Sequence, residues 1–159
     1  MIEKPIFSIL NTSNTKLVKP VRKTNNSSYH ERKIRFDKTH TMRFPVTEEQ
    51  EKSLRKAYIL YKSQFNNESI TSFITSLLRF GLRHQELHKE IDYKDTKKYK
   101  TVKPNQIEYE MISGVHGLAI EWGLSERQAL HRILISVLLF LDEGGKLTDE
   151  EVQPIRPSK

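Results

Sequence analysis

Residues 39–50 read THTMRFPVTEEQ, and this short stretch decides the fold. Polar and apolar side chains alternate along it, with His40, Met42 and Phe44 on one parity. An alternation of period two predicts a β-strand that turns one face towards a core and the other towards water. Pro45 then ends the predicted strand, because proline cannot donate a hydrogen bond to a ladder.

Two helices are predicted after this strand. Thr47 stands three residues before Gln50, the spacing of an N-cap with a capping box, and the helix runs to about Ser63. Ser69 caps a second helix that extends to about His88. Both helices have an apolar stripe at three- and four-residue spacing, formed by Leu54, Ala57, Tyr58 and Tyr61 in the first and by Ile70, Phe73, Ile74, Leu77, Leu78, Gly81 and Leu82 in the second.

The same order returns later in the chain. Residues 101–104 (TVKP) align with residues 41–44 (TMRF), and a helix is predicted from Gln106 to Trp122. Gly123 then supplies a left-handed helix end, and Ser125 caps a last helix that reaches about Leu141. We therefore expect a mainly α protein with short β-strands, divided into a flexible basic arm (1–37), a first unit (38–90), a connector (91–98), a second unit (99–143) and a loose polar tail (144–159).

Charge points to a polyanionic partner. The chain has 27 Lys and Arg against 20 Asp and Glu, a formal charge of +7, which suits nucleic acid or an anionic surface. Residues 1–37 hold eight basic and three acidic side chains and so carry +5 of that charge. The chain has no cysteine, and its longest apolar run, residues 133–141, is far short of the roughly 20 residues that cross a bilayer. These features predict a soluble cytoplasmic protein without a membrane partner.

The two strand-helix-helix units resemble the ribbon-helix-helix family, the fold of the Arc and MetJ repressors and of many plasmid and conjugation accessory proteins. The tandem arrangement is similar to that of conjugation accessory proteins of F-like plasmids. The resemblance rests on Thr41 to Pro45, on Thr101 to Lys103 and on Gly123 to Ser125, and it covers roughly residues 38–142. It implies that two strands pair as an antiparallel ribbon that enters the major groove of DNA. The strands either pair within one chain, as a pseudo-dimer, or with those of a second chain.

Parity selects the residues that such a ribbon turns towards the bases. If Met42, Phe44 and Val102 point into the core, the candidates for base contact are Thr39, Thr41, Arg43, Tyr99, Thr101 and Lys103. Arg43 and Lys103 can donate to guanine, and each good bidentate contact is worth roughly 1 to 3 kcal/mol of discrimination. The alternative is that these are ordinary polar residues on the wet face of an edge strand. Pro104 stands where the family has an apolar residue, at the end of the second strand.

Phosphates are expected at the starts of the second helices, where free backbone N–H groups and the helix dipole attract anions. The candidates there are Asn67, Ser69, Ser125 and Arg127; Glu68 and Glu126 are left out because they repel phosphate. The basic arm adds Arg22, Lys23, Arg32, Lys33 and Arg35 as candidates for phosphate or minor-groove contact. The alternative for the arm is a solvated leader without a binding role.

Catalysis is not indicated by any motif. His84 and His88 stand four apart, but the sequence between them departs from the zinc-protease motif, and surface histidines at a helix end explain them better. We expect no enzyme activity, no metal and no cofactor. The leading hypothesis is a sequence-specific double-stranded DNA-binding protein, a transcriptional repressor or a plasmid or mobile-element accessory factor, with possible self-association on adjacent sites. The rival is a protein-interaction adaptor for a relaxase or a toxin, and a third interpretation is an all-helical bundle in which the strands are loops.

Overall fold

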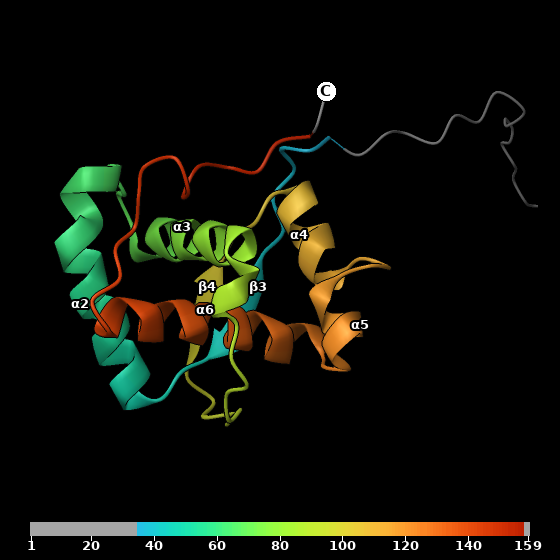
Figure 1. The fold of residues 1–159 in the computed structure, drawn as a ribbon, viewed down its shortest axis with the longest axis horizontal. Helices are drawn as coiled ribbons and strands as arrows, with labels where there is room; N and C mark the ends of the chain where they lie inside the picture. The colour runs from blue at the N-terminus through green and yellow to red at the C-terminus, as the bar shows by residue number, and fades with distance from the viewer. Residues whose placement is uncertain (1–34, 158–159) are drawn as a thin grey trace, which may run out of the picture. The chain divides into compact units, whose positions relative to one another are not determined.

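The computed structural model describes residues 35–157 (Figure 1). The elements follow in the order β3 (Met42–Pro45), α2 (Glu48–Phe65), α3 (Ile70–Arg83), the 3-10 turn η2 (Gln85–Leu87), β4 (Tyr99–Val102), α4 (Gln106–Ser113), α5 (Leu118–Trp122) and α6 (Glu126–Asp142). A strand followed by helices thus occurs twice, and the prediction of a mainly α protein with short strands is confirmed. None of the helices in this described range is long and apolar enough to cross a membrane.

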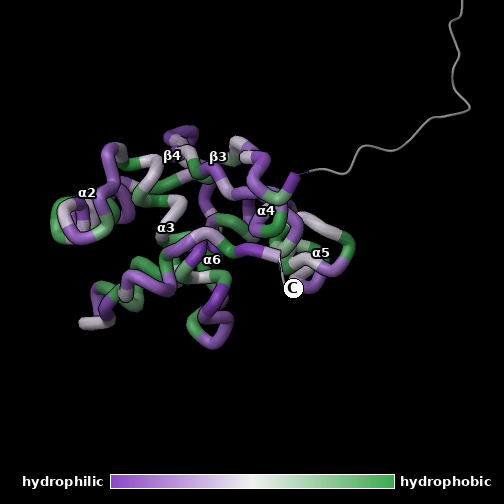
Figure 2. The backbone as a smooth tube through the Cα atoms, turned by 90° about the horizontal axis from the view of Figure 1, so that it is seen from above, coloured by the Kyte–Doolittle hydropathy of each residue, from purple (hydrophilic) through white to green (hydrophobic). Residues whose placement is uncertain are grey.

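The two strands pair with each other within the chain. β3 and β4 form an antiparallel ribbon in which Met42 lies opposite Val102 and Arg43 lies opposite Thr101. Figure 2 shows this ribbon along one edge of the described residues. The interpretation of the strands as loops in an all-helical bundle is therefore wrong, and of the two pairing schemes the structure has the intrachain one.

Proline is accommodated just outside the second strand. β4 ends at Val102, and Pro104 adds only its carbonyl oxygen, which accepts a hydrogen bond from the His40 N–H at 2.9 Å. The missing N–H of proline is therefore not needed at this position. A further bridge pairs Thr39 with Asn105, so the two segments of the chain stay side by side beyond the end of the ladder.

Each strand of the ribbon packs against a helix from the other half of the chain. α3 packs against β4, α6 packs against β3, and α3 and α6 pack against each other. One hydrophobic cluster joins all of these elements, and residues 133–138 of the long apolar run lie buried inside it. The two predicted units therefore share a single core, whose largest fully buried apolar side chains are Phe44, Phe73, Leu54, Ile74, Leu77, Leu78, Leu82, Ile112, Leu130, Ile133 and Leu134.

Gly81 permits the close crossing of α3 and α6. A Cβ atom at Gly81 would lie 2.7 Å from Ile133 Cγ2 and 2.9 Å from Val137 Cγ2. We expect Gly81→Val to lower the free energy of unfolding by about 1 to 3 kcal/mol, the usual cost of overpacking a core. Urea unfolding measures this effect. Ser63→Val, which places the same side chain on the exposed side of α2, should change the stability by less than about 0.5 kcal/mol. Equal effects of the two variants would contradict the close crossing.

The helix predicted from Gln106 to Trp122 is broken in two. α4 ends at Ser113, α5 begins at Leu118, and the turn between them contains Gly114 and Gly117. A Cβ atom at either glycine would lie 2.5 Å from a carbonyl oxygen of α4. The chain therefore folds back on the end of α4 more closely than any other residue allows.

The predicted helix end at His88 is also wrong, because α3 stops at Arg83. His84 and His88 are half-buried rather than exposed. Burial opposes a charge on His84, but its hydrogen bonds to Glu86 and Glu151 hold its pKa above the ordinary value. Burial lowers the pKa of His88, whose Nε2 lies 2.8 Å from the Gly81 carbonyl oxygen.

The C-terminal segment is packed against the helices rather than loose, contrary to prediction. Leu147 and Val152 are buried in the common core. Arg83 Nη1 donates to the carbonyl oxygens of Glu151 and Gln153 at 2.7 and 2.6 Å. The segment passes along α3 in Figure 1, so its few apolar residues and its backbone carbonyls complete the side of the core that the ribbon leaves open.

Candidate nucleic-acid interface

The outward face of the ribbon holds the six residues predicted for base contact. Directly opposite residues of an antiparallel pair share a face, and Met42 with Val102 occupies the buried one. The opposite parity therefore faces outward, and Thr39, Thr41, Arg43 and Lys103 are exposed while Tyr99 and Thr101 are partly exposed. The arrangement presents two cations and three hydroxyl-bearing threonines on one narrow ridge, together with a tyrosine.

Tyr99 organises one end of this ridge. Its ring lies 5.7 Å from the guanidinium carbon of Arg43 and 4.8 Å from that of Arg127. Its hydroxyl group donates to Asp95 Oδ1 at 2.8 Å, which raises the pKa of Tyr99 and lowers that of Asp95. Two arginines on one ring hold their positive charges beside the ribbon in defined positions, and less side-chain entropy is lost when they bind a ligand.

A cavity of about 660 Å³ lies at the surface between β3 and the start of α6. Thr41 and Arg43 line it from the ribbon, and Ser125, Glu126, Arg127 and Gln128 line it from the first turn of α6. The unpaired N–H groups and the positive end of the helix dipole lie at this turn. The cavity therefore lies between an outward ribbon cation and a helix start whose N–H groups favour an anion, although the Glu126 carboxylate at that start opposes one.

A second cavity has the same construction on the other flank. It has a volume of about 420 Å³ and separates β4 from the start of α3. Its lining residues are Lys103 from the end of the ribbon and Ser69, Thr71, Ser72, Thr75 and Arg79 from α3. The Lys103 backbone N–H donates to Thr75 Oγ1 at 3.0 Å, and this bond fixes the strand to the helix. The ribbon thus has a helix N-terminus on each side.

The predicted phosphate contacts at these helix starts divide into two groups. Ser69 and Ser125 cap α3 and α6, and their Oγ atoms accept hydrogen bonds from the N–H groups of Ser72 and Gln128. Both serines are exposed, as is Arg127. Asn67 departs from the prediction, because it is buried and its Oδ1 accepts a hydrogen bond from Ser72 Oγ at 2.8 Å. Asn67 therefore holds the turn before α3 instead of facing outward.

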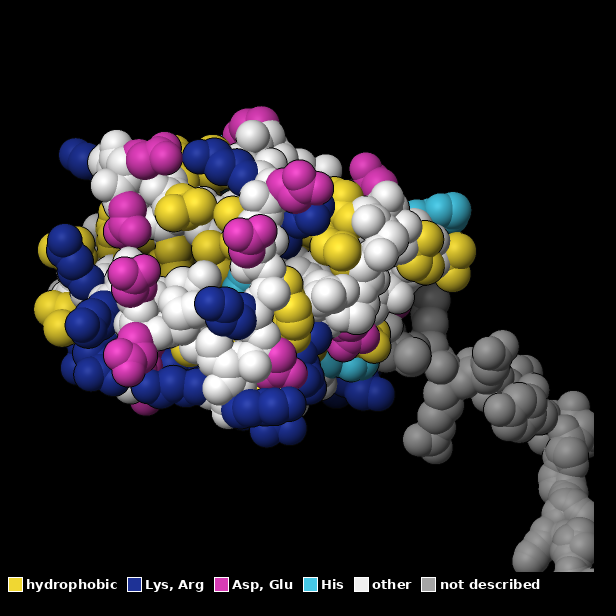
Figure 3. Space-filling model, turned by 90° about the horizontal axis from the view of Figure 1, so that it is seen from below, with side chains coloured by type: hydrophobic (Ala, Val, Ile, Leu, Met, Phe, Trp, Pro, Cys, Tyr) yellow, Lys and Arg dark blue, Asp and Glu magenta, His cyan; other side chains and the backbone are white. Residues whose placement is uncertain are grey.

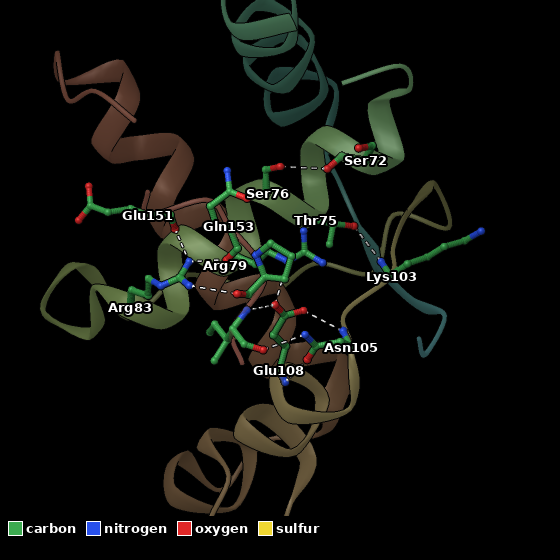
Figure 4. Close-up of polar contacts among 12 residues, drawn as sticks. Ser72, Thr75, Ser76, Arg79, Arg83, Lys103, Asn105, Glu108, Glu151 and Gln153 are labelled. Carbon is green, nitrogen blue, oxygen red and sulfur yellow. Dashed lines mark hydrogen bonds and ion pairs between the residues drawn. The ribbon is translucent and has the colours of Figure 1, made fainter. Parts of the chain in front are cut away.

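A buried ion pair supports the α3 flank (Figure 4). Arg79 Nε donates to Glu108 Oε2 at 2.8 Å, and the Glu108 side chain is fully buried. The same carboxylate accepts the backbone N–H groups of Asn105 at 2.8 Å and Ile155 at 2.9 Å. One glutamate of α4 therefore ties together α3, the chain after β4 and the C-terminal segment.

Glu51 anchors the opposite end of β4 to α2. Lys100 Nζ lies 2.8 Å and Lys98 Nζ 2.7 Å from its two carboxylate oxygens. These ammonium groups lower the pKa of Glu51 from 4.5 to about 2. The start of β4 is thus held by these two ion pairs as well as by its backbone hydrogen bonds to β3.

This anchor predicts a pH dependence. The folded state holds the Glu51 carboxylate ionised, so its contribution to stability is complete above about pH 4.5 and is lost as the pH falls through about 2. We expect Glu51→Gln to be less stable than the wild type at pH 6, with the difference shrinking towards pH 2.5. Urea unfolding across this range measures it, with the exposed Glu49→Gln as control. A difference that does not change with pH would contradict the anchor.

Basic side chains gather on the ribbon side of the described residues. Figure 3 shows Lys and Arg along one edge of the surface, and that edge corresponds to the ribbon side of Figure 2. Arg35 is exposed, but its guanidinium lies 2.6 Å from Asp37, which offsets its charge. The other candidates from the arm, Arg22, Lys23, Arg32 and Lys33, lie outside the described residues.

Sequence reasoning missed three residues that line the α3 flank. Thr71, Thr75 and Arg79 recur at four-residue steps on α3 and so lie on one side of that helix. That spacing was a readable signal. The spacing predicts that the three residues share one side of α3. It does not predict that this side contacts Lys103, because that contact joins residues far apart in the sequence.

Within residues 35–157, no group of three or more His, Asp or Glu side chains is placed to hold a metal ion. Comparisons of the chain with protein-family models, with curated proteins and with solved structures found no match. The function therefore has to be inferred from the geometry of the ribbon and its flanks.

Proposed function

We propose that this chain is a double-stranded DNA-binding protein of the ribbon-helix-helix type, acting as a transcriptional repressor or as a plasmid or mobile-element accessory factor without enzymatic activity. The ribbon enters the major groove, and Arg43, Thr101 and Lys103 contact base edges. The helix starts at Ser69 and Ser125 contact the phosphates on either side. The observation that carries this proposal is a basic outward ribbon with a capped helix N-terminus on each flank.

The dimensions and charges of these parts support the proposal. A two-stranded ribbon fits the major groove, which is about 12 Å wide. The outward side chains include donors for guanine and methyl groups for thymine, and the flanking sites supply backbone N–H groups for phosphate. The two strands place different residues at equivalent positions, since Lys103 takes the place of Arg43 and Tyr99 that of Thr39. The preferred DNA sequence is therefore asymmetric instead of palindromic.

Selection from a random duplex library tests the proposal. The full chain is incubated with the library at about 150 mM salt, and bound duplexes are amplified and sequenced over several rounds. We expect one asymmetric motif to be enriched and to bind at least about a thousandfold more tightly than a scrambled duplex. The absence of enrichment over several rounds would overturn sequence-specific binding.

The rival function, a protein-interaction adaptor for a relaxase or a toxin, gives a different result in the same experiment. An adaptor with incidental positive charge binds all duplexes alike, and its affinity falls steeply with salt for every sequence. A motif that retains its preference between 100 and 250 mM salt therefore supports base readout. Uniform weak binding supports the adaptor.

A further inference from the structure

Two exposed apolar patches lie on opposite sides of the described residues. Ile59 and Leu60 are 70% and 69% exposed on the outer side of α2. Val115 and Ile120 are 80% and 63% exposed in the turn after α4 and in α5. These are the four large hydrophobic side chains that stand out as exposed within residues 35–157. We name them the α2 patch and the α5 patch.

The patches are far apart on the same body. In Figure 1 α2 lies on one side of the crossing α3 and α6 helices, and α5 lies on the other. In Figure 3 apolar side chains are visible near both of these sides, with the basic edge running between them. One molecule therefore cannot cover one patch with its other patch.

The chain segments that carry the two patches have net charges of opposite sign. From residue 52 to the end of α2 the chain has four basic side chains and no acidic one, and the four are Lys52, Arg55, Lys56 and Lys62. Residues 104–126, which contain the α5 patch, have four glutamates and no lysine or arginine. Glu110, Glu121 and Glu126 of that group are exposed.

Contact between two copies of the chain can cover one patch of each kind. We propose that the α2 patch of one molecule docks on the α5 patch of the next, so that copies associate head to tail. Apolar contacts at the centre of such an interface exclude water, and opposite charges at its rim select the partner and the orientation. Because the two surfaces differ and lie on opposite sides, the contact is heterologous and can repeat without closing. The ribbon belongs to neither patch and stays free.

Sedimentation velocity without DNA tests this association. At about 50 mM salt we expect the average mass of the full chain to rise with protein concentration beyond a dimer, and to fall back at 500 mM salt as the rim charges are screened. One variant carries Ile59→Ser with Leu60→Ser, and the other carries Val115→Ser with Ile120→Ser. Each variant alone should be a monomer, with association weakened at least about tenfold.

Mixing the two variants gives the decisive result. The first variant keeps an intact α5 patch and the second keeps an intact α2 patch, so an equimolar mixture should form a 1:1 dimer and nothing larger. A wild type that stays monomeric at all concentrations would overturn the proposal and leave the patches to a different protein. A dimer that persists in one variant alone would overturn the head-to-tail arrangement. Circular dichroism checks that the variants keep the fold. As a second test, Lys56→Glu in one molecule and Glu121→Lys in another should each weaken self-association, and their equimolar mixture should again grow beyond a dimer, because both contacts in the mixture join opposite charges.

Discussion

Replacing Arg43 and Lys103 together by alanine should lower the affinity for the selected DNA motif about a hundredfold and remove most of its preference over a scrambled duplex. Both side chains extend from the outward face of the ribbon, and both are exposed. Each good contact to a base pair contributes roughly 1 to 3 kcal/mol of discrimination, and two such losses at separate positions approximately add. Fluorescence anisotropy with the motif and the scrambled duplex at constant salt measures both effects.

The matched control removes the same two charges far from the ribbon. Lys62 lies in the last turn of α2, and Lys146 follows the end of α6. Neither residue lines the cavities beside the ribbon. The variant Lys62→Ala with Lys146→Ala should therefore weaken binding to both duplexes only slightly and equally. If the control and the ribbon variant lose affinity to the same extent, the ribbon has no special role and the effect is one of net charge.

Glu108→Ala should lower the free energy of unfolding by about 3 kcal/mol, because removing one partner of a buried ion pair leaves the other charge uncompensated. Arg79 loses its partner, and the backbone N–H groups of Asn105 and Ile155 lose their acceptor. Arg79 keeps some contact with water, with 18% of its side chain exposed, so we expect the lower end of the usual range. Urea unfolding at pH 7 measures the loss.

Two further variants separate the ion pair from a general effect of mutating α4. Glu110→Ala changes an exposed glutamate of the same helix, whose carboxylate accepts a hydrogen bond from Gln106, and should shift the stability by about 1 kcal/mol or less. The double variant Arg79→Met with Glu108→Leu removes both charges and should be more stable than Glu108→Ala, since no unpaired charge stays buried. A Glu108→Ala protein that unfolds at the wild-type urea concentration would show that this carboxylate does not hold the three segments together.

Local signals made the helix starts and the strands predictable from sequence. Thr47, Ser69 and Ser125 were expected as N-caps, and each accepts the expected backbone hydrogen bond. Period-two alternation was sufficient to separate Arg43 from the buried Met42, because side chains alternate along any strand. These features depend on residues within four positions of one another, and such short-range rules transfer between proteins.

The features that sequence reasoning missed depend on contacts between distant segments. The break between α4 and α5 follows from the close return of the chain at Gly114 and Gly117, although the apolar period continues through both helices. Asn67 was expected to face outward, but it is buried in the turn before α3, where its Oδ1 accepts a hydrogen bond from Ser72 Oγ. The tail was expected to be loose because it is polar and contains two prolines, yet its Leu147 and Val152 are buried in the common core.

A crystal structure of the full chain with the selected duplex tests the central claim most directly. We expect the β3–β4 ribbon to lie in the major groove, with Arg43 and Lys103 within hydrogen-bonding distance of base edges and the helix starts at Ser69 and Ser125 against phosphates. A complex in which the ribbon faces solvent, and the DNA lies on α2 or on another surface, would contradict the account.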